Sequence, residues 1–177
     1  MAGDSGRLVC ALQVIIGTMA GGTLAFAAVA FALRGAGRGP PPSGPMLSYL
    51  AIGLAAMSIV MWQLLPRAVA TRGRRQIAAG AVAPPARGWL AGLSGSEEGR
   101  LLLLYQTCTI LGAAALEAAA LVACVAYLVE DAPALLALGV GLAGLLLATE
   151  FPTRARAERW VTAQRLLLAE ERSLPLQ

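Results

Sequence analysis

The chain contains no lysine, histidine or asparagine, and only 14% of its 177 residues are charged. Without histidine it can form neither an imidazole acid–base relay nor a His-dependent catalytic triad. Its three cysteines include no CxxC pair, so neither a zinc site nor a redox motif is expected. No phosphate-binding loop or carboxylate pair is visible. We therefore expect a protein that is not an enzyme and has no cofactor.

Apolar residues are abundant and make up 58% of the chain. A helix needs roughly 20 mostly apolar residues to cross the hydrocarbon core of a bilayer. Four segments reach or approach that length: residues 8–33, 46–66, 101–129 and 132–151. The expected fold class is therefore all-α, a four-helix transmembrane bundle formed by residues 1–152, with the lipid bilayer as its first partner.

All 14 basic residues are arginines, and their distribution predicts the topology. Twelve lie before the first span, in the basic 67–100 connection or in the 153–177 tail, whereas Arg34 and Arg38 alone lie on the opposite side. The arginine-rich side of a membrane protein faces the cytoplasm. We expect a multi-pass protein of a bacterial inner (plasma) membrane with both termini cytoplasmic. Because the arginines flank spans and form no nucleic-acid motif, no nucleic-acid partner is expected.

Two segments outside the spans have helical patterns. Residues 67–79 can extend the second helix, and Ser94 with Glu97 three residues later is a capping-box pattern that would start the third. The tail repeats apolar positions at helical spacing and predicts an amphipathic helix. These positions are Ala157, Trp160, Val161, Gln164, Leu167 and Leu168. Such a helix can lie on the membrane surface or dock on the extended second helix, and the sequence favours neither.

The two halves of the bundle have the pattern of a tandem helix-hairpin duplication. Aligning them pairs Gly17 with Gly112, Gly22 with Glu117, Gly53 with Gly139, and Pro66 with Pro152. Small residues let membrane helices approach closely, and Gly17 and Gly21 form a GxxxG step that Gly22 widens. We therefore expect five glycines to serve helix packing: Gly17, Gly21, Gly22, Gly112 and Gly139.

Two acids lie in or beside the apolar segments. Glu117 interrupts the uncharged run 101–129, about 3 Å from its midpoint at the rise of an α-helix. No arginine is predicted at that depth, so we expect a neutral carboxyl, with Thr23 and Ser58 as hydrogen-bond candidates. It is either a proton or cation site or an acid that joins helices by hydrogen bonding. Glu150 is expected to form an ion pair at the interface with a nearby arginine.

The sequence GAAALEAAALVACVAYL, residues 112–128, resembles the carboxylate-bearing helix of ATP-synthase c subunits. Gly112, Glu117, Ala118 and Leu121 match that pattern, and the likeness covers this one helix. The second span lacks the alternating glycines of the c-subunit partner helix. The resemblance implies reversible protonation at Glu117 and assembly into an oligomer.

Two main functions follow from these residues, beside a surface-sensing or anchoring role for the basic 67–100 connection and the 153–177 tail. The first is a non-enzymatic structural or accessory membrane component that works through helix association, with a second copy or another membrane protein as its partner. The alternative is a proton- or cation-linked membrane subunit that uses the carboxyl of Glu117.

The predicted topology can be tested with reporter fusions. A reporter that is active only outside the cytoplasm should be active when fused at Pro41 and silent when fused after residue 153. The reverse pattern would contradict the orientation derived from the arginines.

Overall fold

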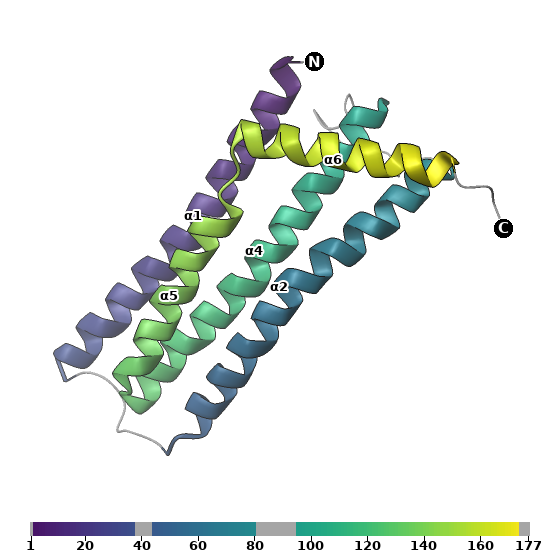
Figure 1. Ribbon diagram of the computed structural model, residues 1–177. Helices are drawn as coiled ribbons and strands as arrows, with labels where there is room; N and C mark the ends of the chain where they lie inside the picture. Colours follow the sequence, from purple (N-terminus) through teal and green to yellow (C-terminus); the bar gives the residue numbers. More distant parts are fainter. Residues whose placement is uncertain (1, 38–43, 81–94, 174–177) are drawn as a thin grey trace. The chain divides into compact units, whose positions relative to one another are not determined.

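Five helices form most of the part of the chain that the structure describes. The structure is a computed structural model that describes residues 2–37, 44–80 and 95–173, with side chains from residue 6 onward. The helices are α1 (Ala2–Gly35), α2 (Met46–Ala78), α4 (Glu97–Glu130), α5 (Pro133–Glu150) and α6 (Arg154–Ser173) (Figure 1). No strand occurs in these ranges. The helices α1, α2, α4 and α5 are long and apolar enough to cross a membrane, which confirms the predicted fold class.

Helix boundaries follow the sequence closely, with one correction. Helix α2 continues through Pro66 to Ala78, as predicted for its extension. In contrast, Pro152 lies in the break between α5 and α6. At the start of α4, the Ser96 hydroxyl accepts a hydrogen bond from the backbone N–H of Gly99 at 3.0 Å. The capping serine is therefore Ser96, and the predicted Ser94 lies outside the described residues.

The chain divides into two compact units. Unit 1 consists of Met1–Gln13, Leu65–Ile110 and Pro152–Gln177, and unit 2 of Val14–Leu64 and Leu111–Phe151. Helix α5 belongs to unit 2 and α6 to unit 1, while α1, α2 and α4 each contribute residues to both.

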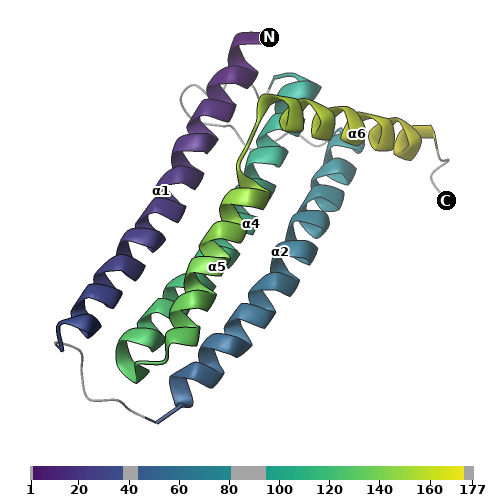
Figure 2. The same ribbon diagram turned by 60° about the vertical axis from the view of Figure 1, so that its left-hand side comes forward.

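The core of unit 2 is built from small residues and leucines of four helices. Figure 2 shows α5 running beside α4, which supplies more of the buried side chains than any other helix of the unit. Half of the most apolar stretch of α4 is buried, against 11% for α2, so α4 is the central helix and α2 a peripheral one. The outer side of α2 exposes large apolar side chains such as Tyr49, Ile52 and Met57, as suits a surface that faces lipid.

Polar groups gather where α4 ends in unit 2. The Glu130 carboxylate accepts hydrogen bonds from the backbone N–H groups of Leu47 and Ser48 at 2.6 and 3.0 Å, and from the Ser48 hydroxyl. These N–H groups belong to the first turn of α2. N–H groups in the first turn of a helix have no hydrogen-bond partner within that helix. The positive end of the helix dipole adds to the attraction. Glu130 therefore caps α2 from the end of α4.

Arg34 and Asp131 complete this end of unit 2. The Arg34 guanidinium donates a hydrogen bond to the Val129 carbonyl at 2.6 Å and lies 3.9 Å from the Asp131 carboxylate. Asp131 has φ +57°, a left-handed conformation that ends α4 and lets α5 begin two residues later. The C-terminal end of α1 is thereby joined to the turn between α4 and α5.

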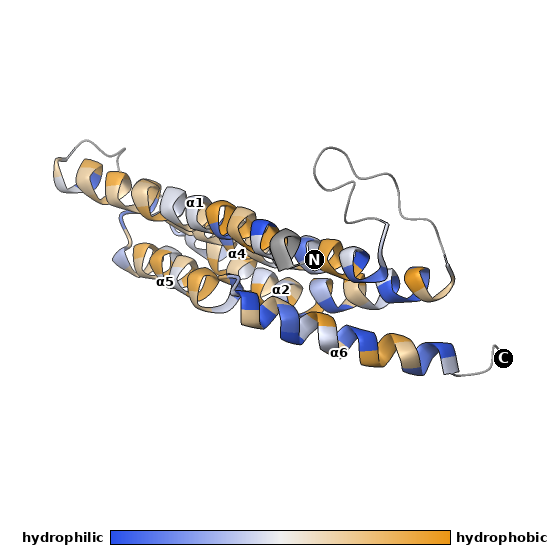
Figure 3. Ribbon diagram, turned by 90° about the horizontal axis from the view of Figure 1, so that it is seen from above, coloured by the Kyte–Doolittle hydropathy of each residue, from blue (hydrophilic) through white to orange (hydrophobic). Residues whose placement is uncertain are grey.

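In unit 1, α6 docks on other helices of the same unit. Ala157 and Val161 are buried against Leu8, Leu12 and Leu101. Figure 3 shows hydrophilic and hydrophobic residues alternating along α6, as its predicted amphipathic pattern requires. Leu168 is also buried, but Leu167 is 39% exposed, so the predicted apolar face was one residue too wide.

Polar contacts complete the docking of α6. Arg74 on the extension of α2 pairs with Glu171 at 2.9 Å and donates to the Gln164 amide oxygen at 2.7 Å. Of the two arrangements left open by the sequence, α6 therefore adopts the docked one. Gln13 on α1 donates to the Pro152 carbonyl at 2.9 Å and holds the chain just before α6 begins.

Replacing Glu130 with alanine should lower the free energy of unfolding by about 2 kcal/mol, because hydrogen bonds to a charged group are removed from a helix end. Unfolding by steric trapping in bicelles would measure the loss. The matched control is Glu158→Ala, whose carboxylate forms an exposed pair with Arg154 on α6 and should cost less than about 0.5 kcal/mol. Equal losses in the two variants would contradict the capping role.

Candidate functional site

Glu117 lies on α4 at the edge between the core of unit 2 and the exposed surface. Leu116 and Ala120 on the same helix are fully buried, whereas Ala114 and Ala118 are exposed. Glu117 itself is half-buried. Its carboxyl is therefore placed where it could be reached from outside the helix bundle rather than enclosed within it.

The hydroxyl groups predicted as partners of Glu117 make other contacts or none. Thr23 is buried on α1, and its hydroxyl donates to the Met19 carbonyl of its own helix at 3.2 Å. Ser58 is half-buried on the face of α2 that also carries Ala55 and Trp62. Across residues 2–37, 44–80 and 95–173, no hydrogen bond or ion pair involves the Glu117 carboxyl. The structure does not join the three residues, and a site formed by them stays a prediction.

The five glycines assigned to helix packing fall into two groups. Gly17, Gly21 and Gly22 on α1 are exposed, and a Cβ added at any of them would meet no described atom within 4 Å. Glu117 therefore does not fill the space beside Gly22. In contrast, Gly112 and Gly139 are buried in close contacts within unit 2.

Gly139 marks the closest approach of α5 to α4. A Cβ built on it would lie 2.6 Å from the Cys124 sulfur and 3.0 Å from the Ala120 carbonyl oxygen. Real side chains do not reach such distances, so only glycine allows these two helices to lie this close. The GxGxxG-like pattern that begins at Gly139 is thus accounted for by helix contact in an apolar span.

Gly112 belongs to a polar cluster that was not predicted from the sequence. Trp62 on α2 donates its indole N–H to the Glu150 carboxylate at 2.5 Å, and both side chains rest against Gly112. A Cβ at Gly112 would lie 3.1 Å from Trp62 Cδ1 and 3.2 Å from Glu150 Oε1. The cluster therefore links α2, α4 and α5, and its signal in the sequence was an acid at the end of an apolar helix.

Glu150, for which an ion pair at the interface was predicted, has an indole as one of its partners. Arg154, an arginine close to Glu150 in the sequence, pairs with Glu158 four residues later on α6, at 2.7 Å. The carboxylate of Glu150 accepts from an indole, a neutral donor, at the end of α5. This contact orients the tryptophan, and an ion pair between Glu150 and a nearby arginine stays a prediction.

Metal-binding groups and reactive cysteines are the other kinds of site considered in the described ranges. They contain no group of three or more His, Cys, Asp or Glu side chains that could hold a metal ion. The three cysteines are free thiols; Cys108 and Cys124 are buried and Cys10 is exposed. Comparisons with protein-family models, curated proteins and solved structures gave no match. The candidate site therefore rests on the residues themselves.

Substituting Gly139 with alanine should destabilise the protein by about 1–3 kcal/mol, because the new methyl group overlaps Cys124 and a backbone carbonyl. Gly141→Ala is the matched control, since a Cβ there meets nothing and should stabilise the helix by up to about 1 kcal/mol. Unfolding free energies of the two variants in the same bicelles provide the comparison. If both variants are as stable as the native chain, α5 does not approach α4 as closely at Gly139 as the structure indicates.

Proposed function

We propose that this protein is a non-enzymatic integral membrane component that works by helix association within the bilayer. Four helices that are long and apolar enough to cross a membrane support its place in the bilayer. The observation that carries the proposal is Glu117, a half-buried carboxyl within an apolar span that has no hydrogen-bond partner in the described part of the chain.

A polar group in hydrocarbon is costly when it is unpaired, by several kcal/mol for an unsatisfied hydrogen-bonding group. A protonated carboxyl carries both a donor and an acceptor, so a polar group on a neighbouring helix would satisfy it in two ways. A second copy of this chain offers an identical carboxyl, and two neutral carboxyls can hydrogen-bond to each other. We therefore propose that the chain associates with a second copy of itself through Glu117.

A second feature agrees with association. The glycines Gly17 and Gly21 on α1 are exposed at the spacing at which another helix can approach closely. Large apolar residues such as Val14 and Val29 flank this stretch and are also exposed. Unit 2 thus presents both a small-residue surface and a carboxyl to its surroundings.

The alternative function is a proton- or cation-linked subunit in which Glu117 is reversibly protonated. The resemblance of its helix to the carboxylate helix of c subunits supports it, and so does the exposure of the side chain to the surroundings of unit 2. Residence in the inner (plasma) membrane with both termini cytoplasmic is part of either proposal and rests on the arginine distribution.

Self-association should weaken when Glu117 is replaced by leucine. Hydrogen bonds between membrane helices contribute about 0.6–2 kcal/mol, so the dissociation constant should rise about 3- to 30-fold. Förster transfer between labelled copies in bilayers of varied protein-to-lipid ratio would measure it. Glu117→Gln is the matched control, because an amide keeps one donor and one acceptor at the same position.

Two results separate the functions. Wild-type association in Glu117→Leu would exclude the carboxyl as an association contact. A proton or Na⁺ flux in proteoliposomes that is lost in Glu117→Gln, together with carbodiimide labelling of Glu117 that Na⁺ or high pH suppresses, would establish the alternative instead.

A further inference from the structure

Most glutamates of unit 1 are engaged by arginines of the same unit. Four ion pairs at 2.7–2.9 Å account for them: Arg74–Glu171, Arg154–Glu158, Arg165–Glu98 and Arg172–Glu97. The basic charge on α6 is thus largely balanced within the chain. The tail that the sequence marks as basic therefore presents less net positive charge than its arginine count indicates.

The extension of α2 is different. Arg67, Arg72 and Arg75 are exposed and form no ion pair with any described residue. Together with Thr71 and Gln76 they line a shallow recess on the side of α2 that faces away from the core of unit 1. We refer to Arg67, Arg72 and Arg75 as the α2 arginine surface.

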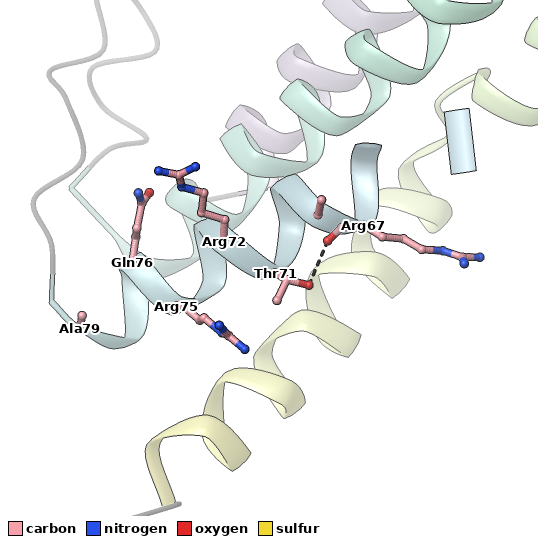
Figure 4. Close-up of a pocket in the computed structure, with 7 residues that line it drawn as sticks. Arg67, Thr71, Arg72, Arg75, Gln76 and Ala79 are labelled. Atoms are coloured by element: carbon pink, nitrogen blue, oxygen red, sulfur yellow. Dashed lines mark hydrogen bonds between the residues drawn. The ribbon is translucent and has the colours of Figure 1, made fainter. Parts of the chain in front are cut away.

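Figure 4 shows how these side chains are spread. Arg72 and Gln76 extend to one side of α2, and Arg67 and Arg75 extend to the other, with Thr71 between them. The Thr71 hydroxyl donates to the Arg67 carbonyl at 2.9 Å, so its proton is already used within the helix. The guanidinium groups are therefore the main donors of the recess, and their fork geometry suits phosphate oxygens.

Depth in the membrane identifies the kind of phosphate. Arg67 follows Leu65, the last residue of the apolar run, after only one residue. At the rise of an α-helix, Arg72 lies about 8 Å and Arg75 about 12 Å further along the axis than Arg67. The headgroup region beyond the hydrocarbon core is about 5–8 Å thick on each side. Arg67 and Arg72 therefore lie at or near the depth of lipid phosphates.

We propose that the α2 arginine surface binds the headgroup phosphates of anionic phospholipids on both sides of α2, with Arg67 and Arg72 in direct contact and Arg75 adding positive charge nearby. Three cations without acidic partners among the described residues, placed next to the end of an apolar helix, complement the negative surface of a membrane leaflet. The residues that line the recess include no aromatic side chain on which a nucleobase could stack. The inference requires neither Glu117 nor self-association and is independent of the proposed function.

The test uses the full-length protein in neutral detergent micelles mixed with phosphatidylglycerol or phosphatidylcholine. Native mass spectrometry counts the lipids that remain bound. A basic side chain near an anionic surface contributes about fivefold in affinity. Phosphatidylglycerol should therefore bind on the order of 100-fold more weakly to the triple variant Arg67→Gln, Arg72→Gln, Arg75→Gln than to the native chain, with phosphatidylcholine unaffected.

The matched control removes the same charge from arginines that have acidic partners: Arg154→Gln, Arg165→Gln, Arg172→Gln. Because exposed ion pairs contribute little to stability, both triple variants should keep the native helical content. A third variant with lysines at 67, 72 and 75 keeps the charge and should bind with intermediate affinity, which preserves the test if the glutamine variant fails to fold.

Three results would overturn the proposal. Equal loss of phosphatidylglycerol in both glutamine variants would mean that only net charge matters. Equal retention in both would mean that lipid binds elsewhere. Binding of inorganic phosphate to the native protein without lipid, with displacement of phosphatidylglycerol, would identify a site for a soluble anion rather than for a headgroup.

Discussion

Close approach of α4 to its neighbours is the constraint on which unit 2 depends. Lipid tails are as apolar as leucine, so membrane helices gain little from burying apolar surface against one another and associate through dense van der Waals contact. Unit 2 meets this condition with alanines on α4 and with Gly139 on α5, where even one methyl group would overlap the facing helix. Leucines such as Leu116 and Leu146 fill the rest of this core, whereas most large apolar side chains of α2 are exposed.

Polar groups in this fold are mostly satisfied inside the chain. Glu130 caps α2, Glu150 accepts from Trp62, and Arg74 joins α2 to α6. Each contact links helices that are distant in the sequence, so polar residues fix which helices meet while small residues fix how closely. The carboxyl of Glu117 and the α2 arginine surface are not satisfied in this way within the described residues. These are the places at which binding to other molecules is proposed.

The number and length of the helices could be predicted from sequence because hydrocarbon thickness sets a minimum apolar length. The extension of α2 past Pro66 was also predicted, although a proline inside a helix removes one hydrogen bond and crowds the preceding turn. The partners of polar side chains could not be predicted. Thr23 satisfies its hydroxyl on its own helix, a local contact that depth alone does not distinguish from a bond to Glu117.

The glycines illustrate the same limit. Gly17 and Gly139 both lie in apolar segments, yet Gly17 is exposed and Gly139 is tightly enclosed. Which glycine meets another helix depends on the rotation of each helix about its axis, and helices that are hydrophobic on all sides carry no periodic signal of that rotation. The docked position of α6 was likewise left open because its arginines suit lipid phosphates and glutamates equally well.

The infrared absorption of the Glu117 carboxyl is the most direct test of whether this group joins two copies of the chain. The difference spectrum between the native protein and Glu117→Gln isolates this group, and it can be recorded at low and high protein-to-lipid ratios. Self-association through Glu117 predicts a protonated carboxyl whose C=O band moves to a hydrogen-bonded frequency as the protein becomes concentrated. A band at the same frequency at both ratios, or an ionised carboxylate, would contradict it.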